Sequence, residues 1–356
     1  MSPAIKKLRI GLGSFDFIKG FCIFSVVLAH SVNRAEQTSW PFQILYAFLY
    51  LSSAAVAAFL MISGYGFKGD SPKKLLKKTF SDLMVPYFLI GAAYAVLCPF
   101  THYPVYHSFR ASFTFGMRYF LAFLLGYHTP GQTVFGFQLE SNVAAYYFLA
   151  LFIALNVLNL IVKLNKPALR LLCVAGCAVM CTVLEVYGIE LFGIGKGLGA
   201  VPLCYFGHLL KKHRLLERLL VTPWSYLALA VIVLLLRGDV SGTTNDLVSQ
   251  VTKWAAGMLT MMLGIMIGKI EWRILDPVKF LGMYSYWILA FHAVEQGSMP
   301  WQLLRVYRVY DGSLYYGIEI LLKAVFILIG CVVLKQITKL KYKRRTAKKT
   351  AQRAAV

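Results

Sequence analysis

Long apolar segments separated by short polar stretches run through most of the 356-residue chain. Segments such as 46–62 and 146–162 carry almost no charge and approach the roughly 20 residues that an α-helix needs to cross a bilayer. The short segments of alternating polarity that form a transmembrane β-barrel are not seen in this sequence. The pattern therefore predicts an all-α integral membrane protein built as a bundle of transmembrane helices.

The apolar pattern predicts about ten spans, each bounded by polar or charged residues. They cover residues 15–33, 44–66, 83–100, 143–162, 168–187, 196–210, 224–236, 250–268, 280–298 and 316–337. The spans 196–210 and 224–236 are short, so we expect tilt or local thinning of the lipid there. Another apolar segment, 113–127, is short and interrupted by Arg118. We expect it to re-enter the membrane or to lie along the outer surface.

The positive charges orient these spans. Placing the N-terminus in the cytoplasm puts most of the 37 Lys and Arg residues at the inner surface. The first span begins after basic residues but lacks a small-x-small cleavage site, so we predict a retained helix rather than a signal peptide. Residues 1–340 are then expected to form one transmembrane domain, and 341–356 a basic cytoplasmic tail. This is the organisation of a multi-pass protein of the cytoplasmic (cell) membrane.

The net charge of +22 raises the question of a nucleic-acid partner. The basic run 335–353 directly follows a span, however, so anionic lipid is the expected partner of the tail and no nucleic acid is expected. Cys173, Cys177 and Cys181 recur every four residues on one helix face. We interpret them as packing residues, because soft-metal sites usually bring CxxC spacing or histidine partners, and we expect no metal.

Ionisable residues inside a span are costly and are therefore candidates for a functional site. The first span carries Asp16, Lys19 and His30. Lys19 and His30 are separated by roughly 16 Å along a helix, and eleven residues bring them back to nearly the same face. One face thus leads from a cation near the cytoplasm to an imidazole in the outer half. The alternative is that Asp16 and Lys19 only pair with each other while His30 bonds to a neighbouring helix.

The second span ends in Phe59-Leu60-Met61-Ile62-Ser63-Gly64-Tyr65-Gly66-Phe67, and five lysines follow it. Glycines permit close approach of backbones, and Ser63 and Tyr65 offer hydroxyl groups. The candidate residues for contact with a phosphorylated donor are Ser63, Gly64, Tyr65, Lys68, Lys73 and Lys74. The alternative is that the lysines only obey the positive-inside rule.

A second histidine lies at a similar depth near the end of the chain. His292 follows Phe280-Leu281-Gly282-Met283-Tyr284-Ser285-Tyr286-Trp287 on the predicted span 280–298. Counted from the inner ends of their helices, His292 and His30 both fall in the outer half. Acidic and basic residues are expected in the same zone and could form a polar cavity with them: Glu185, Glu295, Glu319 and Lys323. For Glu319 and Lys323, spaced by four residues, a simple ion pair is the favoured interpretation.

Three of these segments, in this order, resemble the acyltransferase-3 family of membrane O-acyltransferases. The opening helix resembles the family in its Asp16, its basic residue and its His30. The second motif, Phe59 to Tyr65, is similar to a Phe-rich Ser-Gly-aromatic sequence of the family. The third is similar in the order Gly282…Ser285-Tyr286…His292. The stretch 147–152 also resembles a Trp-Phe-Leu…Leu-Phe stretch of some members. Two positions depart from the pattern: Lys19 where many members have Arg, and Tyr147 where Trp is expected.

The resemblance implies transfer of an acyl group, commonly acetyl, from a coenzyme A thioester to a hydroxyl of an envelope glycan, a glycolipid or a related lipid-linked acceptor. It implies His30 as general base or acyl carrier, with His292 as a second catalytic or orienting residue. Asp16, Lys19 and the lysines after Gly66 are expected near the phosphates of acyl-CoA, the only cofactor-like group expected. No separate hydrolase-like domain is seen, so transfer has to finish within the bundle.

Two other classes stay open at this point. A bundle with a polar interior also describes a transporter or exporter of a small polar or lipid-linked molecule, although no pair of interrupted helices in matching half-positions is evident. A non-catalytic membrane domain that senses or anchors a partner is the other. The sequence does not define the acceptor, the acyl length or the oligomeric state.

Overall fold

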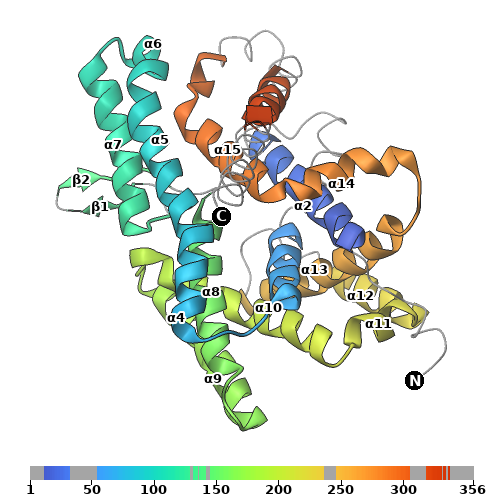
Figure 1. The fold of residues 1–356 in the computed structure, drawn as a ribbon. Helices are drawn as coiled ribbons and strands as arrows, with labels where there is room; N and C mark the ends of the chain where they lie inside the picture. Colours follow the sequence, from blue (N-terminus) through green and yellow to red (C-terminus); the bar gives the residue numbers. More distant parts are fainter. Residues whose placement is uncertain are drawn as a thin grey trace, which may run out of the picture.

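The computed structural model describes residues 12–32, 54–128, 131–134, 136–141, 145–235, 246–304, 318–330, 332–333 and 336. These residues form a helical bundle with one small antiparallel hairpin, in which Thr133 of β1 (Thr133–Val134) lies opposite Gln138 of β2 (Phe137–Gln138). The helices, drawn in Figure 1, are α2 (Leu12–Val32), the helix Ala54–Gly66, α4 (Pro72–Thr79), α5 (Val85–Thr101), α6 (Tyr103–Tyr106), α7 (Phe109–Leu125), α8 (Tyr146–Ile161), α9 (Pro167–Val186), α10 (Ile194–Lys212), α11 (Leu215–Leu220), α12 (Pro223–Leu235), α13 (Asp246–Gly268), α14 (Asp276–Met283), α15 (Ser285–Ser298) and the helix 318–330.

The predicted all-α class is confirmed for the described residues, and a helix lies in each segment predicted to span. Four described helices are long and apolar enough to cross a membrane by themselves: Gly13–His30, Pro72–Thr101, Pro167–Val186 and Val251–Gly268. The helices Ala54–Gly66 and Tyr146–Ile161 are apolar but shorter, as is Pro223–Val233. The full count of ten crossings and the cytoplasmic position of both termini stay predictions. Residues 44–53 of the second predicted span and the tail 341–356 lie outside the described residues.

The helix that contains the span expected at 83–100 begins earlier than that span. The helix is continuous over the 30 residues Pro72–Thr101, and a π-helical turn at Phe80–Met84 joins α4 to α5. Pro72 is at the first position of α4, where its missing N–H costs nothing. Leu75 and Thr79 are buried while the lysines between them are exposed, so α4 is amphipathic and too polar for a hydropathy pattern to include.

The span expected as one helix over 280–298 is also corrected. It is interrupted at Tyr284, where α14 ends and α15 begins. The interruption lets α14 pack closely on α2 while α15 turns to pack on α5, as the crossing elements in Figure 1 show.

The apolar segment 113–127 belongs to α7, which packs along α5 as the second arm of a helical hairpin. Phe109, at the start of α7, contacts Phe100 at the end of α5, with ring centroids 6.0 Å apart. Near its other end, Phe123 lies against Tyr87 and Gly91. The helix α7 therefore follows only the second half of the long helix Pro72–Thr101. Whether it re-enters the membrane stays a prediction.

Two glycine crossings hold the centre of the bundle together. A Cβ at Gly20 on α2 would lie 1.8 Å from the backbone oxygen of Val278, and one at Gly282 on α14 would lie 1.6 Å from that of Asp16. The helix Ala54–Gly66 crosses α10 in the same reciprocal way, because Gly64 meets Cys204 at 1.9 Å and Gly207 meets Met61 at 2.0 Å. Small residues allow such close approach, which is a main source of helix association in membranes.

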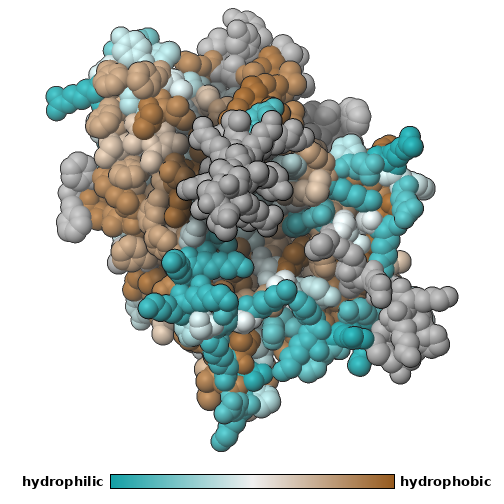
Figure 2. Space-filling model, in the orientation of Figure 1, coloured by the Kyte–Doolittle hydropathy of each residue, from teal (hydrophilic) through white to brown (hydrophobic). Residues whose placement is uncertain are grey.

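The surface separates hydrophilic and hydrophobic elements. Figure 2 shows hydrophilic residues over α4 and along the side that carries the turn between α13 and α14, whereas α5 and α7 are mostly hydrophobic. The exposed cations of α4 are Lys73, Lys74, Lys77 and Lys78. This distribution agrees with a basic surface at one end of an apolar bundle, as the positive-inside rule requires for cytoplasmic loops.

Candidate functional site

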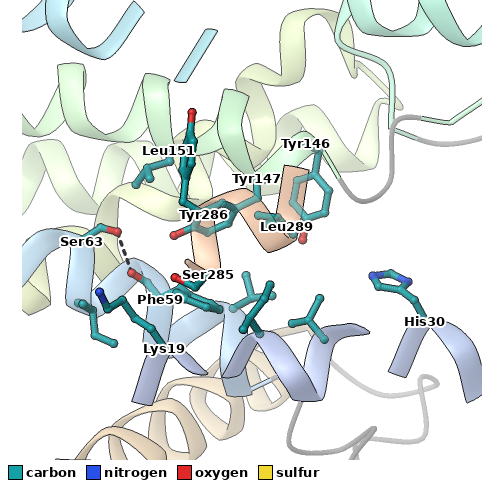
Figure 3. Close-up of a pocket in the computed structure, with 14 residues that line it drawn as sticks. Lys19, His30, Phe59, Ser63, Tyr146, Tyr147, Leu151, Ser285, Tyr286 and Leu289 are labelled. Atoms are coloured by element: carbon teal, nitrogen blue, oxygen red, sulfur yellow. Dashed lines mark hydrogen bonds between the residues drawn. The ribbon is translucent and has the colours of Figure 1, made fainter. Parts of the chain in front are cut away.

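A cavity of about 200 Å³ runs along one face of α2 in the middle of the bundle (Figure 3). Lys19 and Ser63 lie at one end of it and His30 at the other. Its lining residues come from α2, the helix Ala54–Gly66, α8 and α15: Lys19, Ile23, Val26, His30, Val56, Phe59, Ile62, Ser63, Tyr146, Tyr147, Leu151, Ser285, Tyr286 and Leu289. The predicted single face of α2, from a cation to an imidazole, is thus one wall of a real cavity.

The cavity has an apolar wall with a few hydroxyl groups. Isoleucine, valine, leucine and phenylalanine side chains make most of its surface, and Ser63, Tyr147, Ser285 and Tyr286 add polar atoms between Lys19 and His30. Its volume is enough for on the order of a dozen water molecules. A wall of this kind favours an uncharged, partly polar group over a charged one.

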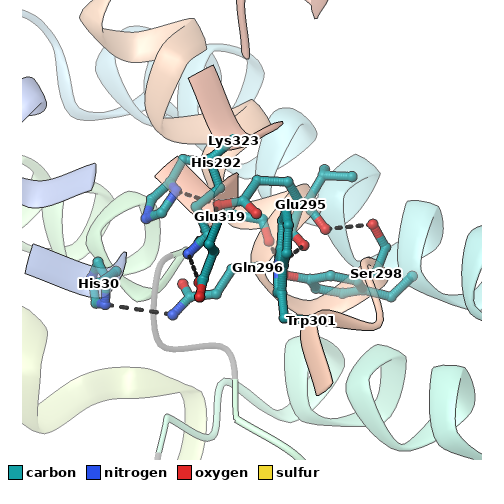
Figure 4. A network of polar contacts seen from close by, with 11 residues as sticks. His30, His292, Glu295, Gln296, Ser298, Trp301, Glu319 and Lys323 are labelled. Atoms are coloured by element: carbon teal, nitrogen blue, oxygen red, sulfur yellow. Dashed lines mark hydrogen bonds and ion pairs between the residues drawn. The ribbon is translucent and has the colours of Figure 1, made fainter. Parts of the chain in front are cut away.

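At the far end, two histidines from different helices meet. The ring centroids of His30 on α2 and His292 on α15 lie 5.3 Å apart. Nδ1 of His30 lies 3.4 Å from Nε2 of Gln296, one turn after His292 on α15. The prediction that both histidines share a depth in the bundle is confirmed, and Figure 4 shows them at the edge of one polar network.

Behind His292 lies a fully buried chain of charged side chains (Figure 4). Nδ1 of His292 is 2.7 Å from Oε1 of Glu295, and neither side chain is exposed. Nζ of Lys323 lies 3.9 Å from Oε1 of Glu295 and 2.9 Å from Oε1 of Glu319. The favoured interpretation of Glu319 and Lys323 as an ion pair is confirmed, with Glu295 added to it.

This buried network is expensive to form and is held by its surroundings. Buried ions cost several kcal/mol each unless partners compensate them. Two carboxylates face one ammonium, so the network is neutral when one further proton is held among His292, Glu295 and Glu319. Nε2 of His292 is buried and has no hydrogen-bond partner among the described residues. Nε2 of His292 is therefore the nitrogen through which the network can bind a further group.

Neighbouring helices fix the position of α15. The hydroxyl of Tyr94 on α5 donates to the backbone oxygen of Ala293, and Nε1 of Trp301 donates to that of Glu295 at 3.2 Å. The ammonium of Lys323 also lies 5.2 Å from the centre of the Trp301 ring, a cation–π geometry. The histidine end of the cavity is consequently held by contacts with α5 and with the residues that follow α15.

At the other end, Asp16 and Lys19 form an ion pair of 2.6 Å that is partly exposed. Lys19 lines the cavity together with Ser63, whose hydroxyl donates to the backbone oxygen of Phe59 at 2.8 Å. Asp16 is not among the lining residues. The alternative interpretation, in which Asp16 and Lys19 pair with each other, is therefore correct for these two residues. The ion pair leaves Lys19 at the mouth of the cavity.

Gly64 and Tyr65 do not line the cavity. Gly64 is occupied by the crossing with α10, which gives it a packing role. The ring of Tyr65 lies 5.1 Å from that of Phe15, and Nζ of Lys211 lies 5.8 Å from its centre. Tyr65 therefore joins the start of α2 and the end of α10 with the end of its own helix.

The predicted lysines lie outside the cavity on an exposed surface. Lys68 and Lys73 are exposed, and Lys74 is 2.9 Å from the carboxylate of Asp70. The hydrogen bond from Lys74, and then the amide of Ser71, hold the pKa of Asp70 below its usual value. The cation of Lys74 is consequently shared with a carboxylate of its own chain.

One predicted member of the polar zone is elsewhere. Glu185 pairs with Lys196 at 2.6 Å and lines a different cavity, so it does not join the polar network of His292 as expected. Residue spacing gives the depth of Glu185 along its helix, but it does not give the lateral position of that helix in the bundle. Gln296 was missed, although its spacing of four from His292 places it on the same helix face. Tyr146 was missed too, while Tyr147, Ser285 and Tyr286 were quoted in motifs without a role.

Among the described residues, no group of three His, Cys, Asp or Glu side chains is arranged to hold a metal ion. The chemistry available at this site is that of imidazole, carboxylate, ammonium and hydroxyl groups. An imidazole at the end of a mainly apolar cavity can exchange a proton with a hydroxyl that enters it.

Comparison with known proteins agrees with the ordered motifs. Residues 12–336 match the family model described as an acyltransferase domain, that of acyltransferase 3. Neither curated proteins nor solved structures give a match. The family match covers α2, which carries His30, and α15, which carries His292, and it extends over nearly the whole chain. The chain therefore belongs to the acyltransferase-3 family and is a membrane acyltransferase.

Proposed function

We propose that the protein transfers an acetyl group from acetyl coenzyme A, which enters from the cytoplasm, to a hydroxyl of an envelope glycan, a glycolipid or a related lipid-linked acceptor. The observation that carries this proposal is the cavity with Lys19 at one end and His30 at the other. A thioester on a flexible arm can reach His30 through such a cavity while its phosphates stay at the basic end.

The donor end supports this direction of entry. Lys19 lies at the cavity mouth, and exposed lysines of α4 lie on the basic surface of the same bundle. Phosphate groups are attracted by ammonium groups and cannot be desolvated cheaply inside an apolar wall. The thioester end of the donor, in contrast, is neutral and narrow and suits the apolar part of the cavity.

The histidine end supplies the proton transfer. The acceptor oxygen attacks the thioester carbonyl while His30 takes the hydroxyl proton; the new C–O bond forms, the C–S bond breaks, and the proton passes from the imidazolium to the leaving sulfur. Atoms and charges balance without a further reactant. If His30 instead carries the acetyl group, its nitrogen first attacks the thioester, so that a C–N bond forms, the C–S bond breaks and the sulfur leaves as the thiol. The acceptor oxygen then attacks the acetyl-imidazole, so that the C–O bond forms, the C–N bond breaks and the hydroxyl proton returns to the imidazole.

Gln296 selects the basic nitrogen of His30. A base acting through Nε2 needs its proton on Nδ1, and Nδ1 faces the amide of Gln296. With the amide turned over, so that its nitrogen and oxygen exchange places, the amide oxygen accepts a hydrogen bond from Nδ1–H. In this arrangement Gln296 is a positioning residue for His30, and the His292–Glu295 pair is the proton-holding group beside it.

The experiment compares His30→Ala with the wild type in membrane vesicles supplied with radiolabelled acetyl coenzyme A. We expect base-labile label in the envelope fraction to fall by about 10²–10⁴-fold, the usual contribution of a general base. His213→Ala, which removes an exposed histidine at the end of α10, is the matched control. Full transfer by a folded, inserted His30→Ala protein would remove His30 from the mechanism, and flux of a substrate without any ester would favour transport.

A further inference from the structure

A second cavity lies beside the first and has a different chemistry. It has a volume of about 280 Å³ and is lined by His128, Glu185, Gly188, Ile189, Glu190, Gly193, Gly195 and Lys196. Its walls come from the turn after α7, the end of α9 and the start of α10. Where the first cavity is mainly apolar, four of the eight residues that line this one are ionisable.

The polar side chains of the second cavity are paired across it. Nζ of Lys196 is 2.6 Å from Oε1 of Glu185, and Nδ1 of His128 is 3.2 Å from Oε2 of Glu190. The backbone N–H of His128 also donates to that oxygen at 3.4 Å. All four side chains keep some exposure, between 16% for Glu190 and 41% for Glu185, so a ligand in the cavity can reach their polar atoms.

Glu185 and Lys196 each lie at the helix end where their charge is unfavourable. Glu185 is in the last turn of α9 and Lys196 in the first turn of α10. A helix favours anions at its N-terminus and cations at its C-terminus, so each of these residues occupies the unfavourable end. Residues that oppose a local rule without a packing reason tend to mark functional sites.

Tyr146 lies between the two cavities. This side chain lines the first cavity, and its ring centroid is 6.1 Å from that of His128 in the second. In Figure 3, Tyr146 lies on the His30 side of the first cavity. The second cavity is therefore next to the histidine end, away from the lysine end.

The charges of the second cavity decide what it can bind. Burial lowers the pKa of His128, against the raising effect of Glu190, so the charged form of its imidazole is disfavoured. Two carboxylates then face one ammonium, and a phosphorylated or carboxylated ligand is disfavoured. Hydroxyl groups, in contrast, can donate to the carboxylates and accept from Lys196.

We propose that the second cavity binds the acceptor as a neutral, hydroxyl-rich sugar and presents one hydroxyl past Tyr146 to His30. This assignment rests on the proposed function and adds to it the chemical class of the acceptor. The donor and the acceptor then reach His30 from different cavities, one lined by apolar groups behind a cation and one lined by carboxylates. The separation keeps the phosphates of the donor out of the acceptor site.

The test uses two soluble probe acceptors, octyl β-glucoside and octyl β-glucuronide, with membranes containing the full-length protein and radiolabelled acetyl coenzyme A. We expect ester on the neutral glucoside at least tenfold above that on the anionic glucuronide. In Glu185→Gln and Glu190→Gln, the KM for the glucoside is expected to rise at least fivefold while the KM for acetyl coenzyme A stays at the wild-type value. Glu271→Gln, at an exposed position in the turn before α14, is the matched control.

The outcomes separate the two proposals. An unchanged glucoside KM in both variants, equal use of the two glycosides, or ester on the envelope fraction with none on either glycoside would overturn the sugar site alone. Loss of acetyl coenzyme A affinity in the variants would also overturn it, because the residues would then act on the donor or on the fold. Absence of ester on every acceptor in the wild type would instead count against the proposed function.

Discussion

Two acid–base pairs have the same spacing in the sequence and nearly the same length, but they differ in burial and in their connection to other charges. Asp16 and Lys19 are three residues apart on α2 and 2.6 Å from each other; His292 and Glu295 are three residues apart on α15 and 2.7 Å from each other. The first pair is 21% and 29% exposed, whereas the second is fully buried and connected to Lys323 and Glu319. Burial, rather than distance, decides what each pair contributes.

The difference has a physical origin. An exposed pair gains little, since water already solvates both charges, and measured values are about 0–1 kcal/mol. A buried pair is weak evidence of net stabilisation, but removing one partner leaves an uncompensated charge and costs about 3–5 kcal/mol. The Asp16–Lys19 pair can therefore open to a charged ligand at low cost, while the histidine network keeps one arrangement.

The largest expected effect comes from removing the central cation of the buried network. Lys323→Met leaves Glu319 and Glu295 facing each other without compensation and is expected to lower the free energy of unfolding by about 3–5 kcal/mol. Asp16→Asn, its counterpart at the exposed pair, is expected to lower it by about 0–1 kcal/mol. Denaturant unfolding of the purified protein in detergent measures both. Equal losses would show that the two pairs do not differ as their burial suggests.

The next effect tests the glycine crossing that supports the cavity wall. Gly64→Ala places a Cβ 1.9 Å from the backbone oxygen of Cys204, whereas Gly66→Ala, two residues later, meets open space. We expect the first variant to lose about 1–3 kcal/mol of stability, since the helices must separate. The second is expected to stay within about 0.5 kcal/mol of the wild type. Thermal unfolding in detergent distinguishes them, and an unaffected Gly64→Ala protein would contradict the packing role.

The smallest effect is expected at the exposed lysines. Neutralising Lys73 and Lys74 together, as glutamines, is expected to raise the KM for acetyl coenzyme A by roughly threefold to tenfold at low salt and less at high salt. The control pair Lys166→Gln and Arg273→Gln removes the same charge from exposed positions elsewhere. If both double variants behave like the wild type, the lysines of α4 serve orientation in the membrane and not donor binding.

Much of the architecture could be predicted from sequence. The length of the apolar segments predicts the helices, and the distribution of lysines predicts which ends of the helices face the cytoplasm. Both can be read from sequence because burial of apolar groups in lipid and exclusion of charges act on each helix separately. Depth follows as well, since the rise per residue is fixed, and the meeting of His30 with His292 confirms it.

Lateral position and helix breaks could not be predicted in the same way. Glu185 was assigned to the histidine zone on depth alone, but it faces Lys196 across a different cavity. The break at Tyr284 accompanies the close contact of Gly282 with the backbone of Asp16, a contact between segments more than 250 residues apart in the chain. Hydropathy carries no information about which helices become neighbours, so these features depend on tertiary packing.

The most direct test of the account is a cryo-electron microscopy map of the full-length protein with bound coenzyme A. We expect the phosphates near Lys19 and the α4 surface, and the pantetheine arm within the cavity with its sulfur beside His30. Coenzyme A bound with its thiol outside this cavity, and with the space between Lys19 and His30 empty, would contradict the account.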